Sequence, residues 1–508
     1  MKEENIKIVD ILQDGRGVGR TDTKTVFVEG AVFGEVLDCE IIEEKKNFFE
    51  AKKIQTKIPS PYYHRPPCPY YNECGGCSIM DIDYQTQLKI KKNLIKSSIY
   101  KTCKIDLEDL EIIPSKPLRY RNKIRLTVDE EGNFSYKKQY SSDLVKIKDC
   151  LLAKEEISRE MGKIEEIIKE LYKSHKGFIK EITLRTDEKD LLINIAIKDK
   201  NKDYKEEIKE AFKDTGYSVN ILERKNENLL GKESLVYNIF ARKIKISAND
   251  FYQVNDYQIE NLYGLAKEFL GENKKLLDLY CGSATSSIAI NEDNIVGVDI
   301  NKNAIKDANK NAQVNGLKSY KFFAKDAKFI TANFIKKEKI DALVVDPPRA
   351  GLDKNLIKQI GQTGLKELVY ISCNPQTLAR DIKRFMNQGY KLKKIKAVDM
   401  FPQTMHVETV ALLSKLNTEH HLDIEIGEDE LSEIDFSKEA TYGEIKKYVL
   451  DKYGLKVSSL YIAQVKRKHG LIERENYNFS KKENQRVPNC PEEKEKAIED
   501  ALKWFGMI

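Results

Sequence analysis

The feature that most constrains the fold is an alternation of apolar strands and helical segments between about residue 255 and residue 416. Five apolar runs read KKLLDLYC, NIVGVDI, YKFFAKD, IDALVVDPP and ELVYISC, with helical patterns between them. Neighbouring parallel strands need a crossover connection, usually a helix. This order therefore predicts a doubly wound parallel sheet, in which ligands bind at the carboxyl edge of the strands.

The first of these strands leads into a candidate nucleoside pocket. LLDLYCGSATSS is an apolar strand, a turn of small residues and a helix, which brings backbone N–H groups close to a ligand. Asp299 ends the next strand about 20 residues after Asp278, where a carboxylate can bind a ribose. The turn lacks G-x-G-x-x-G, so S-adenosylmethionine (SAM) fits better than a dinucleotide. Asp326 ends a third strand and could meet an adenine amino group. The alternative for each acid is a helix N-cap.

Three residues further along the chain, each at the end or the start of a strand, supply groups for chemistry. Asp346 lies in VVDPPRAGLD, Cys373 follows a strand in VYISCNPQTLARD, and Glu408 lies in MFPQTMHVETVALLS. A free cysteine is commonly a small buried core residue. A thiol and carboxylates on one rim also suit carbon methylation of a pyrimidine. The thiolate adds at C6, C5 attacks the methyl group of SAM, and a base then removes the C5 proton.

These motifs resemble those of the RNA uracil-5 methyltransferases, most closely the subfamily with an iron–sulfur cluster that acts on 23S rRNA. The resemblance covers about residues 5 to 415 and is carried by CPYYNECGGC, YRNKIRLTV, FYQVN, LDLYCG, VVDPPRAG, ISCNPQTLARD and HVETVALL. It implies that Cys373 is the nucleophile and Glu408 the proton acceptor. The residues that it implies for the SAM pocket are Gln253, Tyr280, Thr285, Asp299, Asp326 and Asp346. Ala284 departs from the family turn, which usually has glycine there.

The resemblance also implies a multidomain architecture. Residues 1–57 alternate in short apolar and polar runs, which predicts a small OB-like β-barrel of five strands, the TRAM domain. Residues 58–240 predict an α+β domain, and residues 241–416 a Rossmann-like SAM methyltransferase domain. In such relatives a helix at about 82–112 packs with the catalytic domain. Residues 417–508 lie outside the family pattern and predict an acidic linker followed by a helical extension.

Four cysteines suggest a metal site. Cys68, Cys74 and Cys77 lie together in a Pro/Gly-rich segment, and Cys150 follows later in KIKDC. Four thiolates suit either a [4Fe–4S] cluster or a structural zinc. Two C-x2-C knuckles would favour zinc, but only one is present, and the family resemblance favours the iron–sulfur cluster. We expect it to act as a structural staple.

RNA is the expected partner. HRPP, RYRNK and YKKQY mix basic and aromatic side chains, which suit phosphate contact and base stacking, although each could equally be a solvated charged face. The basic tail segment YIAQVKRKHGLI could bind RNA or merely pack. The net charge of +6 permits an RNA partner without demanding one. With no secretory signal and no membrane-length apolar run, we expect a cytoplasmic monomer without membrane association.

The expected reaction is methylation of C5 of a uridine in 23S rRNA. The alternatives are methylation of uridine-54 in tRNA, a catalytically silent RNA-binding relative, and a zinc-stapled nucleic-acid adaptor. The first alternative stays open because the pocket does not read the surrounding RNA sequence.

Overall fold

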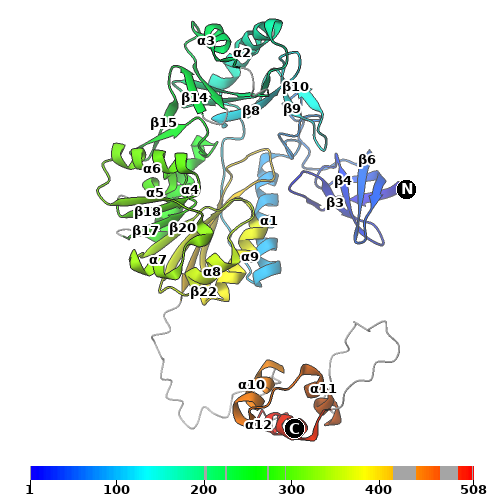
Figure 1. Ribbon diagram of the computed structural model, residues 1–508. Helices are drawn as coiled ribbons and strands as arrows, with labels where there is room; N and C mark the ends of the chain where they lie inside the picture. The colour runs from blue at the N-terminus through cyan, green and yellow to red at the C-terminus, as the bar shows by residue number, and fades with distance from the viewer. Residues whose placement is uncertain are drawn as a thin grey trace. The chain divides into compact units, whose positions relative to one another are not determined.

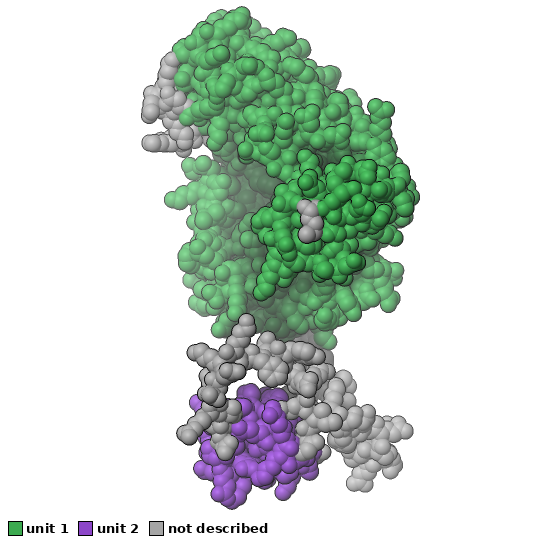
Figure 2. Space-filling model, turned by 90° about the vertical axis from the view of Figure 1, so that its right-hand side faces the viewer, with its two compact units in different colours: residues 1–418 green, residues 419–508 purple. Residues whose placement is uncertain are grey.

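The computed structural model contains two compact units, residues 1–418 and residues 419–508 (Figure 2). The residues that it describes are 2–198, 203–222, 226–271, 274–291, 293–415, 442–469, 490–505 and 507–508. Each unit is treated by itself. No helix within these described ranges combines the length and the apolar character needed to cross a membrane.

The N-terminal domain is a small β-structure of six strands, one more than predicted, because residues 10–11 form a separate two-residue strand that pairs with the next one. The strands are β1 (Lys2–Lys7), β2 (Asp10–Ile11), β3 (Gly17–Arg20), β4 (Thr25–Glu29), β5 (Val36–Glu44) and β6 (Phe48–Ile58), in the sheet order β1-β5-β6-β4-β3-β2. Gly19 lets strands pack closely, since a Cβ there would lie 2.4 Å from Cγ2 of Ile6. Apolar residues of β1, β2, β4, β5 and β6 fill the core of the barrel.

The central domain is a seven-stranded sheet covered by α2 (Glu155–Ser174) and α3 (Lys205–Phe212). Its strands, in the sheet order β10-β9-β8-β11-β12-β13-β14, are β10 (Leu144–Lys146), β9 (Phe134–Lys137), β8 (Lys123–Val128), β11 (Ile179–Thr186), β12 (Leu191–Ile197), β13 (Ser218–Leu222) and β14 (Asn226–Leu230). Helix α2 buries Ile157, Met161, Ile164 and Ile168 against the sheet, at the three- and four-residue spacing of an amphipathic helix.

The third domain holds an eight-stranded sheet with helices on both faces (Figure 1). The order is β19-β18-β17-β20-β21-β23-β22-β7, and β17 to β21 are parallel while β23 is antiparallel to both of its neighbours. The strands are β17 (Leu276–Leu279), β18 (Ile295–Asp299), β19 (Tyr320–Ala324), β20 (Ala342–Val345), β21 (Glu367–Ser372), β22 (Tyr390–Val398), β23 (Glu408–Lys415) and β7 (Ile112–Ile113). The central strands are mostly apolar because both faces are buried, with Asp278 in β17 as a buried exception.

Helices and a hairpin complete this domain. The helices are α4 (Asp256–Leu270), α5 (Thr285–Ile290), α6 (Lys302–Val314), the 3-10 turn η1 (Ala327–Phe329), α7 (Ala332–Lys337), α8 (Lys354–Gly361) and α9 (Pro375–Met386), and the hairpin is β15 (Ser234–Ile239) with β16 (Arg242–Ser247). Helix α1 (Tyr84–Cys103) comes from the N-terminal half of the chain but packs against α9. With β7, it ties residues 84–113 to this sheet.

The described residues of the second unit form a cluster of three helices. Its helices are α10 (Tyr442–Tyr453), α11 (Ser459–Lys468) and α12 (Glu492–Trp504), packed around Ile445, Val449, Ile462, Val465 and Ile498. Two of the three correspond to the helical patterns in the sequence, and α12 was not predicted. The predicted acidic linker lies outside the described residues.

Candidate active site and thiol cluster

Cys373 occupies the turn between β21 and α9 at the carboxyl edge of the sheet. Asn374 follows it and caps α9 by accepting a hydrogen bond from the N–H of Gln376 at 3.0 Å. Asn374 Nδ2 and Thr377 Oγ1 donate to the carbonyl oxygen of Arg349, at 3.4 and 3.2 Å. These bonds fix the Cys373 turn to the DPPR loop after β20.

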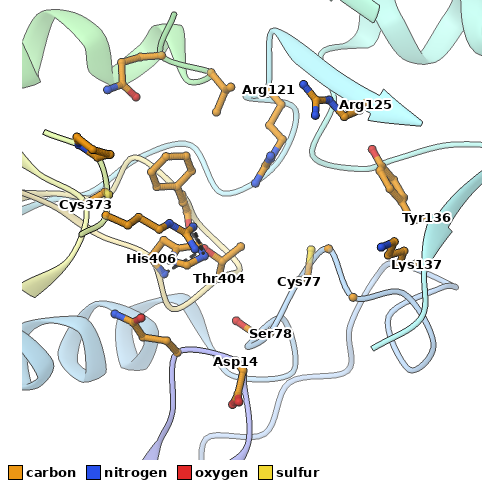
Figure 3. A pocket seen from close by; sticks show the side chains of 18 of the residues that line it. Asp14, Cys77, Ser78, Arg121, Arg125, Tyr136, Lys137, Cys373, Thr404 and His406 are labelled. Atoms are coloured by element: carbon orange, nitrogen blue, oxygen red, sulfur yellow. Dashed lines mark hydrogen bonds between the residues drawn. The ribbon is translucent and has the colours of Figure 1, made fainter. Parts of the chain in front are cut away.

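The thiol opens into a cavity of about 1390 Å³ whose wall includes residues from all three domains of the first unit. The barrel contributes Asp14, and the catalytic domain contributes Cys373 and Glu408. Figure 3 shows Cys373 on one side of the cavity and Tyr136 and Lys137 on the other, with Arg121 between them. A cavity that joins the sheet edge to a barrel and a basic, aromatic hairpin is large enough for more than one small ligand.

The residues expected in the SAM pocket divide into two groups. Gln253, Tyr280, Asp299 and Asp346 lie in the cavity wall. Asp299 accepts hydrogen bonds from the N–H groups of Gly282 at 3.0 Å and Asn301 at 2.8 Å. The other two, Thr285 and Asp326, are not among the described residues that line this cavity. Thr285 begins α5, and Asp326 caps η1 and pairs with Lys328 at 2.9 Å, as the helix-cap alternative predicts.

The turn after β17 has a strained residue where the family usually has glycine. Ala284 is fully buried and adopts φ 62°, a left-handed conformation that costs an L-residue about 1–2 kcal/mol. Its methyl group packs in the hydrophobic core, and the burial of this group offsets part of the strain.

Three buried carboxyl groups repel one another along the sheet edge. Burial raises the pKa of Asp278 to about 6, although Ser286 Oγ donates to its Oδ2 at 2.7 Å. Burial and then Asp278 raise the pKa of Asp346 to about 7. Burial and then Asp346 raise the pKa of Glu408 well above its ordinary value, and Glu408 Oε2 has no hydrogen-bond partner among the described residues. An unpaired buried carboxyl oxygen is suited to receiving a proton.

Arg349 is the functional candidate that sequence reasoning missed, although it lies inside the VVDPPRAG motif. Burial, then Glu408 and Asp346, raise the pKa of Cys373 to about 11, whereas the positive charge of Arg349 lowers it. Arg349 also opposes the rise in the Glu408 pKa. Its Nη2 lies 3.1 Å from His406 Nε2, and burial lowers the His406 pKa to about 4. His406 is therefore neutral near pH 7, and its Nε2 accepts the Arg349 hydrogen bond.

The four cysteines singled out in the sequence line one smaller cavity. Cys68, Cys74, Cys77 and Cys150 surround about 90 Å³. The N–H of Gly76 donates to Cys74 Sγ at 3.4 Å, and burial raises the pKa of the Cys74 thiol to about 11. No three His, Cys, Asp or Glu side chains in the described part of the chain are grouped tightly enough to hold a metal ion. Arg121 and Tyr136 border both this cavity and the larger one.

Fold and site together define an RNA methyltransferase-type protein: a SAM methyltransferase fold joined to a TRAM barrel. The family model "tRNA (Uracil-5-)-methyltransferase" matches residues 83–416, and the TRAM domain model matches residues 2–54. The chain belongs to the RNA uracil-5 methyltransferase family.

Three similar proteins support this assignment. An uncharacterized RNA methyltransferase of Caldanaerobacter subterraneus subsp. tengcongensis is 32% identical over 81% of this chain and 98% of its own length. One from Clostridium tetani is 33% identical over 81% of this chain and 96% of its own. The crystal structure of Pyrococcus abyssi tRNA (uracil-54, C5)-methyltransferase with S-adenosyl-L-homocysteine has a TM-score of 0.65 and 26% identity, covering 80% of this chain and 99% of that one.

Proposed function

We propose that the protein methylates C5 of a uridine in RNA with SAM as the methyl donor. The observation that carries the proposal is the meeting of Cys373, Glu408, Asp346 and Arg349 in one cavity at the carboxyl edge of the sheet. Cys373 adds through sulfur to C6 of the uracil, which makes C5 nucleophilic. Bound SAM supplies the methyl group through its positively charged sulfonium.

Glu408 then serves as the base. It removes the proton from the methylated C5, and the electrons of that C–H bond restore the C5–C6 double bond as the thiolate leaves. Arg349 stabilises both anionic groups, because its charge opposes the rise in the pKa of each. The Asp299 carboxylate is suited to the ribose of SAM, as its offset in the sequence suggests.

We propose 23S rRNA as the substrate. The four cysteines around one cavity support this assignment, since the iron–sulfur subfamily acts on 23S rRNA. Uridine-54 of tRNA is the second candidate, because the Pyrococcus abyssi protein is named for that nucleotide. The target base leaves its stack to reach a buried thiol. Mass-spectrometric mapping of methyluridines in rRNA and tRNA from a deletion strain separates the two.

The four thiols also fit a [4Fe–4S] cluster. All four border one small cavity, and a backbone N–H already donates to the Cys74 sulfur, as is common around clusters. A [4Fe–4S] cluster is ligated by four cysteine thiolates, and the lining of this cavity includes four cysteines. Iron and sulfide analysis after anaerobic purification tests this. Cys74→Ser should lose iron, and unchanged iron would refute the ligand set.

The mechanism is tested with a transcript that carries 5-fluorouridine. Fluorine at C5 blocks the final elimination, so the unaltered enzyme should become covalently attached in the presence of SAM. Cys373→Ala should form no adduct and methylate nothing. Glu408→Gln should accumulate an adduct even with ordinary uridine. Methylation by the Cys373→Ala variant would refute the thiol mechanism.

A further inference from the structure

The segment that carries the proposed base is held from outside the catalytic sheet. Residues 399–407, here called the catalytic loop, connect β22 to β23, and Glu408 is the first residue of β23. Thr404 and His406 of this loop face the large cavity (Figure 3). The position of the catalytic loop therefore determines the shape of the cavity wall near the proposed uracil site. It also determines where β23 begins, and so where Glu408 lies.

Four consecutive carbonyl oxygens of the catalytic loop each accept a hydrogen bond from a different part of the chain. Asn255 Nδ2 donates to Met400, Lys91 Nζ to Phe401 and Tyr120 Oη to Pro402, each at 3.0 Å, and the N–H groups of Ser78 and Ile79 donate to Gln403 at 3.0 and 3.2 Å. In return, Ser78 Oγ accepts from the N–H of Met405 at 3.1 Å. Ser78 and its neighbour Ile79 thus make three hydrogen bonds to the loop, two of them from Ser78 itself.

Gln403 adopts a conformation that needs this support. Its φ is 69°, a left-handed backbone that is uncommon for a residue other than glycine. Gln87 Oε1 accepts from the Gln403 N–H at 3.1 Å, and Gln87 Nε2 donates to Gln403 Oε1 at 2.9 Å. A strained residue of this kind persists only where its surroundings fix it.

Ser78 directly follows Cys77, one of the four thiols of the cluster cavity. The segment before Ser78 is also held on its other sides. The N–H of Gly75 donates to the carbonyl of Lys137 at 3.0 Å, beside the β9 hairpin. In the barrel, a Cβ on Gly15 would lie only 2.9 Å from Cβ of Ser78, so the two backbones are in close contact. The cysteine segment therefore contacts the barrel, the central sheet and the catalytic loop at once.

We propose that Ser78 is a positioning residue through which ligation of the four thiols holds the catalytic loop, and with it Glu408, in place for proton removal. The inference rests on the proposed thiol mechanism and cluster, and deepens both. Four bound thiolates fix Cys77, Cys77 fixes Ser78, and Ser78 fixes Gln403 and Met405. The cluster then acts on the chemistry through backbone geometry rather than by electron transfer.

This arrangement should affect two steps of the proposed reaction to different extents, namely attack by the Cys373 thiol and removal of the C5 proton by Glu408. The turn of Cys373 is held by Asn374 and Thr377, which donate to the Arg349 carbonyl oxygen. The catalytic loop contacts this part of the site at the Arg349 side chain, through His406 at 3.1 Å, and not at the turn itself. Glu408 begins the strand immediately after that loop. Loosening the loop should therefore slow removal of the C5 proton, and hence release of the adduct, more than it slows attack by the thiol.

The experiment uses the full chain with Ser78→Ala, purified anaerobically, with iron measured. Adduct formation is timed with a 5-fluorouridine transcript, and adduct release with a uridine transcript in a single turnover on denaturing gels. The iron content of the Ser78→Ala variant should match that of the unaltered protein, and the rate of adduct formation should change less than about twofold. The rate of adduct release should fall about fivefold to tenfold, as expected for one lost hydrogen bond. Ser97→Ala, which removes only a local bond to the Leu94 carbonyl on α1, is the matched control.

A second variant and a measurement on iron-depleted protein test the positioning role independently of Ser78→Ala. Tyr120→Phe removes a different donor to the same loop and should show the same split between the steps. Removing iron from the unaltered protein should slow release likewise, and the combined effect with Ser78→Ala should be smaller than the product of the two separate effects, because both weaken the same contact between the cysteine segment and the catalytic loop. Equal slowing of both steps, or unchanged release, would overturn the positioning role. Absence of any adduct with the iron-loaded, unaltered protein would refute the proposed function itself.

Discussion

The buried ion pair between α1 and the catalytic loop gives the most direct quantitative prediction. Lys91 Nζ lies 2.5 Å from Asp399 Oδ1, and both side chains are 0% exposed. Tyr84 Oη donates to the other carboxylate oxygen at 2.9 Å. Burial lowers the Lys91 pKa, and the Asp399 charge opposes that shift. Lys91→Met leaves Asp399 buried without a countercharge, which should lower the free energy of unfolding by about 3–5 kcal/mol.

Urea unfolding followed by circular dichroism measures this, with an unchanged m-value showing that only stability has moved. Lys89→Met places the same substitution on the exposed face of the same helix and should cost less than about 0.5 kcal/mol. The double variant Lys91→Met, Asp399→Asn removes both charges and should recover most of the loss. A cost below about 1 kcal/mol for Lys91→Met, or a double variant no better than the single one, would refute the reasoning.

Three further predictions concern the cavity. In the unaltered protein the positive charge of Arg349 lowers the Cys373 pKa, so Arg349→Gln should shift the pH dependence of adduct formation to higher pH. Arg349→Lys keeps a positive charge and should shift it less. Identical pH profiles would remove Arg349 from this role. The affinity for SAM should rise as pH increases through about 6 to 7, because a positive ligand favours the ionised forms of Asp278 and Asp346. Isothermal titration calorimetry measures this affinity. The affinity for S-adenosylhomocysteine, which lacks the sulfonium charge, should depend less on pH, and parallel curves for the two ligands would contradict the argument. Ala284→Gly should change the free energy of unfolding by less than about 1 kcal/mol in urea, because relief of left-handed strain offsets the lost methyl burial; a larger loss would show that the methyl packing dominates.

The sequence carried enough information for the catalytic sheet because its signals are local. Each apolar strand, small-residue turn and helical pattern can be recognised within a short stretch of sequence. Parallel strands then bring their carboxyl ends to one edge of the sheet. That rule is why Cys373, Asp346 and Asp299, far apart in the chain, share a cavity in the structure. The rule that the strand ends meet at one edge could not show that the Asp326 side chain caps η1, because an acidic residue at a strand end can either cap a helix or bind a ligand.

The contacts that hold the site were not predictable, because they join distant parts of the chain. Lys91 and Asp399 are separated by 308 positions, and neither belongs to a motif with a known chemical role. The sequence of α1 contains several lysines and predicts an amphipathic helix whose lysines face solvent, since lysine is seldom fully buried unless it is paired. Arg349 was missed for a related reason: its effect on Cys373 depends on β20 and β21 being neighbours and on the turn bonds after each.

The charges in the cavity explain why a thiol with a raised pKa is compatible with nucleophilic catalysis. With Glu408 and Asp346 nearby, ionising Cys373 adds a further negative charge to a buried cluster that Arg349 only partly offsets. A ligand that carries a positive charge reverses this balance, since it favours the ionised form of each acidic group around it. The same charge lowers the pKa of both Cys373 and Glu408, toward the thiolate and the carboxylate that the proposed reaction requires. The nucleophile and the base would thus become active together, when the methyl donor is bound, which limits attack on uracil in its absence.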